Sequence, residues 1–236
     1  MSALVVDIAD LDFAWPGEPP LLGIPRFQLD AGERLFLRGA SGSGKSTLLG
    51  LIAGVLEAQS GKIDVLGHDM MQLAGGGRDK VRADHLGVIF QLFNLVPYLS
   101  VVQNVILPCR FSRRRQSEVN AAGGADREAR RLLAQLGLDD PSLLSRNVTD
   151  LSVGQQQRVA AARALIGNPS LIIADEPTSA LDADSRDRFI SLLSNEVQKT
   201  GAALLFVSHD GGLAKLFDRA LDLSEINQSG RLAGAA

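Results

Sequence analysis

A glycine-rich segment could hold phosphate: Gly39-Ala40-Ser41-Gly42-Ser43-Gly44-Lys45-Ser46 matches G-x-x-x-x-G-K-[ST] at every fixed position. Glycines let backbone N–H groups surround phosphate oxygens without a Cβ in the way. Lys45 can reach the β- and γ-phosphates of a nucleotide, and the Ser46 hydroxyl can bind Mg²⁺. The alternative is a Gly/Ser linker that contains a lysine by chance. A strand predicted before the segment and a helix predicted after it favour the phosphate loop.

Two acids end an apolar run. Residues 171–174 are typical of a buried parallel strand, and Asp175 and Glu176 follow directly. Parallel strands present their carboxyl ends to the ligand crevice, so Asp175 would hold Mg²⁺ and Glu176 could polarise an attacking water. Solvated acids at a strand end are the alternative, which the phosphate loop disfavours.

The elements that position these residues follow from hydrophobic periodicity. Strands are predicted at 4–8, 34–37, 62–65, 87–90, 171–174, 203–207 and 221–223, and helices at 46–53, 126–136, 155–166 and 184–199. A chain break is expected after Trp15 because prolines follow it, an exposed loop at 75–77, and an irregular polar segment at 110–126. Alternating strands and helices predict an α/β fold with a parallel core.

Composition narrows the class of protein. A chain of 236 residues suits one large domain, or a core with an inserted subdomain. The formal net charge is −3, which disfavours a general nucleic-acid or anionic-membrane binder. Cys109 is the single cysteine, so no intrachain disulfide can form, and three histidines with one cysteine disfavour a dedicated zinc site.

No membrane or export signal is expected. The first 15 residues carry three aspartates and no basic residue, unlike a secretory signal. Residues 86–109 are uncharged, but their prolines and amides would be costly in hydrocarbon. This stretch is either a partner-docking surface or a buried strand followed by a buried loop.

Between the two motifs lies Leu151-Ser152-Val153-Gly154-Gln155-Gln156-Gln157-Arg158. With it, the order of features resembles the ATP-binding cassette (ABC) ATPases over nearly the whole chain. The features are a phosphate loop at 39–46, a glutamine loop at Gln91, an LSGGQ-like signature at 151–155, the Asp175-Glu176 strand end, a D-loop at 179–182 and a histidine loop at His209. A phosphate loop alone would not separate this family from kinases or GTPases.

The resemblance implies a P-loop NTPase (RecA-like) core at about 1–91 and 158–236, with a small N-terminal antiparallel β subdomain. An inserted helical subdomain would occupy about 92–157, within a single ABC ATPase domain of residues 1–236.

The resemblance also implies a role for each site residue. Ser152, Gly154 and Gln155 would hold the γ-phosphate of ATP bound to a second copy, while Gln91 senses it. The catalytic residues would be Glu176, His209 and Lys45. The metal ligands would be Ser46, Gln91 and Asp175. The residues in contact with the nucleotide would be Trp15, Gly39, Ala40, Ser41, Gly42, Ser43, Gly44, Lys45, Ser46, Thr47, Gln91, Ser152, Gly154, Gln155, Asp182 and His209. Without the resemblance, Ser152 and Asp182 would be read as helix N-caps, His209 as a surface residue and Gln91 as merely polar.

Two positions need separate comment. Trp15 lies where relatives carry an aromatic residue that stacks on adenine; a core or surface aromatic is the alternative, and Phe13 is the other candidate. Val153 stands where glycine is commoner in the signature. A β-branched residue resists positive φ, so the turn can work only if Val153 has β or helical dihedrals. We predict a working but weaker ATP sandwich.

The resemblance implies the ATP-hydrolysing subunit of a membrane ABC transporter or mechanotransmission complex, with ATP and Mg²⁺ as cofactors. ATP binding would close a head-to-tail homodimer and hydrolysis would reopen it, driving transmembrane permease subunits from the cytoplasmic face of the inner cell membrane. Membrane contact would be through the permease only, with no nucleic acid. The alternatives are a soluble ABC ATPase of DNA repair or translation, which usually carries paired cassettes or long coiled coils, and a P-loop kinase, which lacks the signature.

The string at 90–108 looks most like the lipoprotein-release, macrolide-efflux and cell-division subfamily. Residues 93–99 are expected to form an apolar floor on which the permease docks. Arg110 and the arginines at 113–115 would face lipid headgroups or, as the favoured alternative, belong to a solvated loop.

Overall fold

A computed structural model describes residues 3–179 and 181–229, which form two compact units. Unit 1 contains the described residues up to Arg82 and those from Ala203 onward, and unit 2 is Ala83–Ala202. Ala180, within the predicted D-loop, lies outside the described residues.

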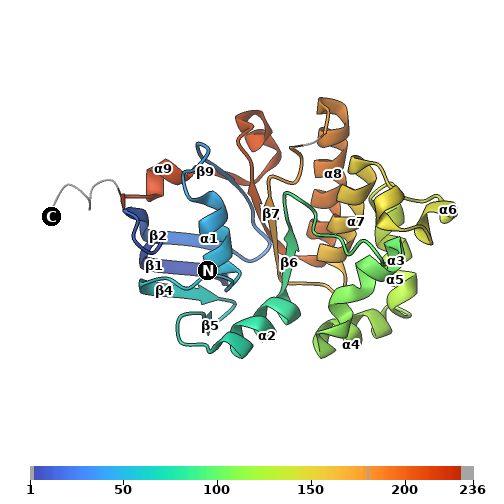
Figure 1. Cartoon of the computed structure of the whole chain (residues 1–236), viewed down its shortest axis with the longest axis horizontal. Helices are drawn as coiled ribbons and strands as arrows, with labels where there is room; N and C mark the ends of the chain where they lie inside the picture. Colours follow the sequence, from blue (N-terminus) through green and yellow to red (C-terminus); the bar gives the residue numbers. More distant parts are fainter. Residues whose placement is uncertain (1–2, 180, 230–236) are drawn as a thin grey trace. The chain divides into compact units, whose positions relative to one another are not determined.

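Unit 1 contains a four-stranded antiparallel sheet in the order β2-β1-β4-β5 (Figure 1). Its strands are β1 (Leu4–Ala14), β2 (Pro20–Asp30), β4 (Ser60–Val65) and β5 (His68–Asp69). The expected break after Trp15 is therefore only a turn, and the strand predicted at 4–8 runs on to Ala14. Pro20 is compatible with β2 because this strand lies at the sheet edge, where a missing N–H leaves no ladder bond unmade.

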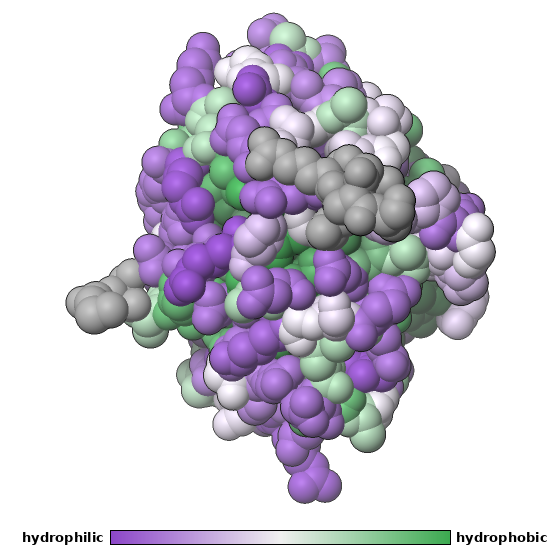
Figure 2. All heavy atoms as spheres, turned by 90° about the vertical axis from the view of Figure 1, so that its left-hand side faces the viewer, coloured by the Kyte–Doolittle hydropathy of each residue, from purple (hydrophilic) through white to green (hydrophobic). Residues whose placement is uncertain are grey.

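The antiparallel sheet is apolar on its inner side only. Val6, Ile8 and Leu11 of β1 are fully buried, as are Leu22 and Leu29 of β2. Burial of such side chains stabilises a domain by about 1.5–3 kcal/mol each. On the side of the molecule seen in Figure 2, hydrophilic residues cover most of the surface.

Unit 1 also holds three parallel strands in the order β8-β3-β9. They are β3 (Arg34–Arg38), β8 (Ala203–Val207) and β9 (Arg219–Asp222), and β3 leads through the glycine-rich loop into α1 (Lys45–Ile52). The rings of Phe36 on β3, Phe206 on β8 and Phe217 form one cluster, with centroids 5.0–6.2 Å apart. This core places the carboxyl end of β3, and hence the phosphate loop, on a rigid support.

Helix α2 (Gly75–His85) includes the three glycines that were predicted as an exposed loop, so that prediction is wrong. Tertiary bonds offset the poor helix propensity of glycine. Arg78 donates to the Leu73 carbonyl at 2.8 Å and forms an ion pair with Glu57, while Arg82 donates to the Ala53 carbonyl at 3.0 Å. Unit 1 ends with the 3-10 helix η3 (Gly211–Leu216), strand β9 and α9 (Leu223–Ile226).

Unit 2 combines two parallel strands with a set of helices. Strands β6 (Leu86–Ile89) and β7 (Leu171–Asp175) pair in register, Leu86 opposite Leu171. The helical segments are α3 (Val101–Ile106), η1 (Leu107–Arg110), α4 (Arg113–Ala121), α5 (Ala125–Gln135), α6 (Pro141–Leu144), η2 (Val148–Asp150), α7 (Val153–Leu165) and α8 (Ala183–Thr200). The helices predicted at 126–136 and 184–199 are confirmed as α5 and α8 within one residue at each end.

Helix α7 lies very close to β6. A Cβ atom built on Gly87 would be 2.2 Å from the carbonyl oxygen of Ala164, so only glycine allows this approach. This part of α7 is made of small buried residues, Ala160–Ala162 and Ala164. Small side chains on the helix and the missing side chain at Gly87 allow the two backbones to come close together.

Helix α4 occupies part of the segment 110–126 that was predicted to be irregular. The arginines at 113–115 were predicted to be solvated or to face lipid, and for Arg115 this prediction is wrong because its side chain is buried. Ser112 caps the helix by accepting a hydrogen bond from the Arg115 N–H. The Arg115 side chain is only 1% exposed and donates to the carbonyls of Ala83 (2.8 Å), Ile166 (2.7 Å) and Leu86 (2.5 Å). Burial lowers its pKa to about 10. Arg115 therefore ties α4 to the start of β6 and the end of α7.

Candidate active site

The phosphate loop joins β3 to α1 in unit 1. Gly44 is the N-cap of α1 and has left-handed φ of 99°. No side chain caps this helix, and its first turn has no acidic residue. Its first N–H groups and the positive end of its dipole are thus available to an anion.

Lys45 lies across the loop and is 9% exposed. Its Nζ donates to the carbonyl oxygens of Gly39 and Ala40, both at 2.8 Å. Among the described residues, the Ser43 hydroxyl is a buried group without a hydrogen-bond partner. A buried, unsatisfied hydroxyl is unfavourable, and a phosphate oxygen would satisfy it. The loop therefore fits a bound phosphate group.

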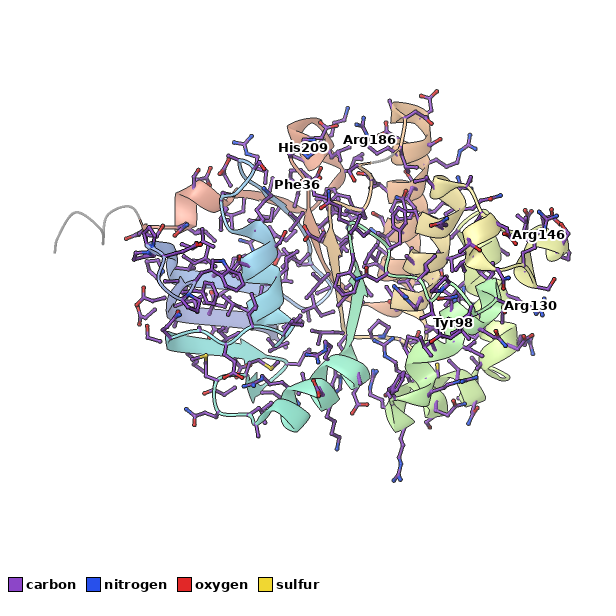
Figure 3. The ribbon with its side chains drawn as sticks, in the orientation of Figure 1. Phe36, Tyr98, Arg130, Arg146, Arg186 and His209 are labelled. Carbon is purple, nitrogen blue, oxygen red and sulfur yellow. The ribbon has the colours of Figure 1, made fainter. Side chains whose placement is uncertain are left out.

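The loop borders a pocket of about 450 Å³ in unit 1. The pocket is lined by Arg38, Gly39, Ala40, Ser41, His209, Gly211 and Asp222. His209 is exposed and follows β8 and the buried Ser208; its place is labelled in Figure 3. The structure thus brings His209 to the same pocket as the phosphate loop.

Two pocket residues were missed in the sequence. The Nε atom of Arg38 lies 2.9 Å from a carboxylate oxygen of Asp222, and the two residues are opposite each other in the β3–β9 register. Hydrogen bonds from Ser224 lower the pKa of Asp222, and the positive charge of Arg38 contributes a smaller part of this shift. Arg38 directly precedes Gly39, but only the placement of β9 beside β3 reveals the pair.

Trp15 lies at the turn between β1 and β2. It is 40% exposed, and its ring meets Phe13 edge to face, with centroids 5.1 Å apart and planes at 89°. Phe13 is 5% exposed. Of the two candidate aromatics, Trp15 therefore has the accessible face.

In unit 2, the candidate metal-site residues follow adjacent strands. Ile89 pairs with Ala174 at the carboxyl ends of β6 and β7. Asp175 is the last residue of β7, and Gln91 comes two residues after β6 ends, beyond the 41%-exposed Phe90. Amide and carboxylate oxygens are ligands suited to Mg²⁺, so this edge of unit 2 can supply part of a coordination shell.

Glu176 begins the turn after β7 with a φ of 46°. A left-handed conformation is uncommon for a non-glycine residue and concentrates at functional sites. Asp175 and Glu176 are both half-buried. The turn aims the Glu176 side chain differently from an extended continuation of β7, so the two adjacent acids can have different tasks.

The signature residues form the first turn of α7. The helix begins at Val153, two residues earlier than predicted, because Ser152 is its N-cap. Ser152 and Gln155 form a capping box, and Val153 has no positive φ. The backbone condition that we set for a working signature is therefore met. Val153 is 48% exposed at this end of the helix.

Asp182 is the N-cap of α8 and accepts a hydrogen bond from the Ser185 N–H at 2.9 Å. This bond lowers the pKa of Asp182. Asp182 is thus a helix cap, as the alternative interpretation expected.

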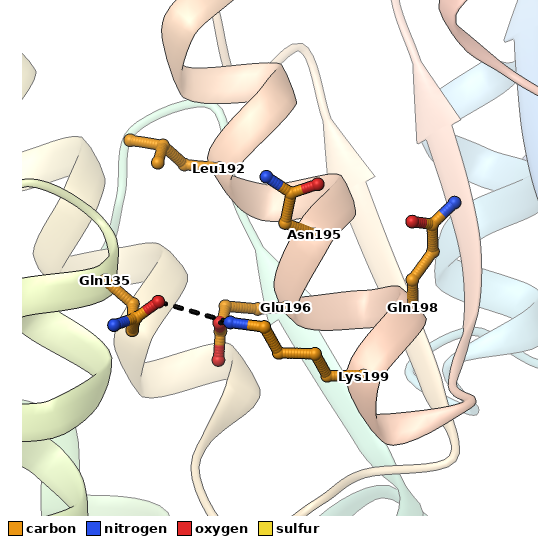
Figure 4. Close-up of a pocket in the computed structure, with 6 residues that line it drawn as sticks. All are labelled: Gln135, Leu192, Asn195, Glu196, Gln198 and Lys199. Atoms are coloured by element: carbon orange, nitrogen blue, oxygen red, sulfur yellow. Dashed lines mark hydrogen bonds and ion pairs between the residues drawn. The ribbon is translucent and has the colours of Figure 1, made fainter.

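A second pocket, of about 380 Å³, lies between α5 and α8 (Figure 4). It is lined by Gln135, Leu192, Asn195, Glu196, Gln198 and Lys199. Lys199 donates to Glu196 at 2.5 Å and to Gln135 at 3.2 Å. This pocket contains none of the candidate nucleotide residues.

Comparison with known proteins decides the family. The sequence model described as ABC transporter matches residues 22–179. The chain belongs to the ABC transporter family. This ABC cassette is 38% identical over 207 residues to the lipoprotein-releasing system ATP-binding protein LolD of Syntrophotalea carbinolica, covering 88% of this chain and 86% of LolD. It is 41% identical over 192 residues to the uncharacterized ABC transporter ATP-binding protein YbbA of Escherichia coli, covering 81% of each.

Among solved structures, the cassette is similar to the dimeric post-hydrolysis state of the ATP-binding cassette MJ0796 bound to ADP and Pi. The TM-score is 0.81 at 30% identity, over 92% of this chain and 93% of the other. The predicted α/β P-loop NTPase fold is thereby confirmed, and the ABC cassette is an ATP-binding, ATP-hydrolysing enzyme. Within residues 3–179 and 181–229, no helix is both long and apolar enough to cross a membrane.

Proposed function

We propose that two copies of this ABC ATPase bind two ATP molecules between them and drive a transmembrane permease. The proposal rests chiefly on two helix starts suited to anions: α1 behind Lys45, and α7 behind Ser152. If each ATP contacts the first in one copy and the second in its partner, a two-fold arrangement makes two complete sites. The dimeric structures of the similar MJ0796 cassette support this arrangement.

Within each site, the triphosphate would be held by the loop at 39–47, with Lys45 leaving its loop carbonyls for the phosphates. Ser46, Gln91 and Asp175 would hold Mg²⁺, which when bound neutralises charge on the phosphates. Glu176 would accept a proton from the attacking water, and His209 would hold the γ-phosphate and orient that water. The hydroxyl of Ser152 in the partner copy would donate a hydrogen bond to a γ-phosphate oxygen. Asp182 would lie at the interface between the two copies.

The loop after Gln91 is the proposed permease-docking surface. Leu92 and Tyr98 are 82% and 81% exposed, which is unusual for large apolar side chains and typical of an interaction site. Similarity to LolD and YbbA, both ABC ATP-binding proteins, supports a transporter-type or mechanotransmission complex. Such a permease would hold the ATPase at the cytoplasmic face of the membrane.

The decisive experiment uses Glu176→Gln. Loss of the proton acceptor should lower kcat by about 100-fold or more while ATP still binds. The variant should therefore accumulate as an ATP-dependent dimer in size-exclusion chromatography with light scattering, and Ser152→Ala added to it should weaken that dimer. Glu118→Gln, a change of the same kind on α4, is the control. Hydrolysis at the wild-type rate, or a monomer at saturating ATP and Mg²⁺, would overturn the proposal.

A further inference from the structure

The turn that follows Gln91 has an unfavourable backbone. Phe93 and Asn94 are consecutive non-glycine residues in the left-handed region, with φ of 57° and 48°. Asparagine tolerates this region, but a bulky aromatic residue does so only when its surroundings impose it. Two backbone bonds form within the turn, from the Phe93 N–H to the Phe90 carbonyl at 3.0 Å and from the Asn94 N–H to the Leu92 carbonyl at 2.6 Å, and contacts from outside the turn add to them.

Arg163 of the signature helix α7 supplies those contacts. Its Nη1 donates to the Asn94 carbonyl at 2.7 Å, and its Nη2 donates to the Phe93 carbonyl at 2.5 Å. Burial lowers the pKa of Arg163. Within the described part of the chain, no ion pair of Arg163 with a carboxylate is found. Its guanidinium group instead donates to the backbone carbonyls of the two strained residues.

The other end of the same loop is fixed by Asn104 of α3, which is fully buried. Its amide accepts from the Val96 N–H at 2.8 Å and donates to the carbonyls of Val96, Leu99 and Ser100 at 3.0–3.1 Å. Residues 93–100 are thus held at one end by α7 and at the other by α3. The exposed Leu92 and Tyr98 are attached to a firmly braced loop.

We propose that Arg163 is a positioning residue that makes the loop 91–99 move with the signature helix. Through it, displacement at Tyr98 is passed to Ser152 at the other end of α7, and closure of the ATP sandwich at Ser152 is passed back to Gln91 and Tyr98. The inference deepens the proposed function and rests on it. It names the contact by which a permease on this loop would feel the nucleotide state.

The planar fork of arginine is what the geometry requires. Two carbonyls of consecutive residues are bonded by two different nitrogens, which a lysine ammonium cannot reproduce with the same rigidity. Arg158 offers a matched control, because it lies on the same helix and donates to the Gly137 carbonyl at 3.4 Å, away from the loop 91–99. Replacing Arg158 should leave the loop 91–99 undisturbed.

The test places a spin label at position 98 by Tyr98→Cys, in a Glu176→Gln background with Cys109→Ala. Cys109 is the one native cysteine, so labelling is then unique. ATP with Mg²⁺ should dimerise the protein and change the label's line shape. Arg163→Met should remove at least about half of that change while dimerisation persists and the ATP dissociation constant stays within about twofold. Arg158→Met should keep the full change.

Arg163→Lys should restore the response only in part, and it replaces Arg163→Met if that variant does not fold by circular dichroism. With Glu176 restored, Arg163→Met should lower kcat more than it raises KM. An undiminished line-shape change in a folded, dimerising Arg163 variant would overturn the inference, as would a dimer with Arg163 intact whose label does not respond. Failure of the parent protein to dimerise with ATP would instead refute the proposed function.

Discussion

Ser152 and Gln155 hold each other at the start of α7. The Ser152 N–H donates to the Gln155 side-chain oxygen at 2.9 Å, and the Ser152 hydroxyl oxygen accepts from the Gln155 N–H at 3.3 Å. Neither bond uses the hydrogen of the hydroxyl. Capping the helix is therefore compatible with donating a hydrogen bond to phosphate, and the structural and functional readings of Ser152 describe one conformation.

The first prediction concerns Val153, which is 48% exposed next to Ser152. Val153→Gly should let the Glu176→Gln protein dimerise at about three- to tenfold lower ATP concentration, because the proposed dimer would no longer have to accommodate a bulky exposed side chain beside Ser152. The glycine should also lower the free energy of unfolding, by up to about 1 kcal/mol. Light scattering across an ATP titration measures the first effect and urea unfolding the second.

Val153→Ala is the control, since it removes bulk without adding glycine's backbone freedom. An ATPase rate and dimerisation midpoint unchanged by both substitutions would contradict the idea that valine weakens the signature.

Sequence reasoning located the elements that have a clear apolar pattern. Strands β7 and β8 are recognisable as short continuous apolar runs, and helix α5 because Ala129, Leu132 and Leu133 form a regular buried stripe. The phosphate loop was recognisable because its chemistry requires fixed residue types at fixed spacing.

Helix α4 was missed because polar contacts, more than an apolar stripe, hold it in place. Its buried residues are Arg115 and Val119. An arginine run resembles a solvated loop until the carbonyls that Arg115 reaches, at Ala83, Leu86 and Ile166, are brought near by the fold. Likewise, the strain at Phe93 and the grip of Arg163 are properties of three-dimensional neighbours that lie about 70 positions apart in sequence.

The second prediction concerns Trp15, the single tryptophan of the chain. If its exposed face stacks on adenine, Trp15→Ala should raise the ATP dissociation constant by about tenfold, since base stacking on an aromatic contributes about 1–3 kcal/mol. Trp15→Phe should retain most of the affinity. The fluorescence of Trp15 should also change on titration with ATP, and equal affinity of the alanine variant would show that Trp15 is only a surface aromatic.

The third prediction concerns Arg115. Arg115→Met keeps the length of the side chain but leaves three carbonyls without their donor, and each buried unsatisfied group costs about 1–3 kcal/mol. We expect the free energy of unfolding in urea to fall by about 3 kcal/mol or more. Arg113→Met, at an exposed position of the same helix, should change it by less than about 0.5 kcal/mol. Two variants of equal stability would disprove the role assigned to Arg115.

The fourth prediction is a pH dependence at Glu196, whose side chain is 2% exposed. Burial alone would raise its pKa, but hydrogen bonds from Lys199 and Arg131 outweigh burial and lower the pKa below its ordinary 4.5. A lowered folded-state pKa means that the stabilisation is fully present above about pH 4.5 and is lost as pH falls through the folded value.

Glu196→Gln should therefore lower the free energy of unfolding by about 2 kcal/mol at pH 7, and by progressively less below pH 4.5. Urea unfolding at a series of pH values measures this difference. Glu225→Gln, at an exposed position on α9, is the control variant. A difference that stays constant or grows on acidification would contradict the assignment.

The close approach at Gly87 has a consequence for how this protein tolerates mutation. A methyl group there would push against the Ala164 carbonyl, and the displaced helix is the one whose first turn carries the signature. The absence of a Cβ atom at Gly87 thus sets the distance between strand β6 and helix α7. Gly87 should tolerate substitution poorly, although it has no assigned contact with the nucleotide. A substitution there should reduce ATPase activity much as the loss of an active-site residue would, because it displaces the signature turn.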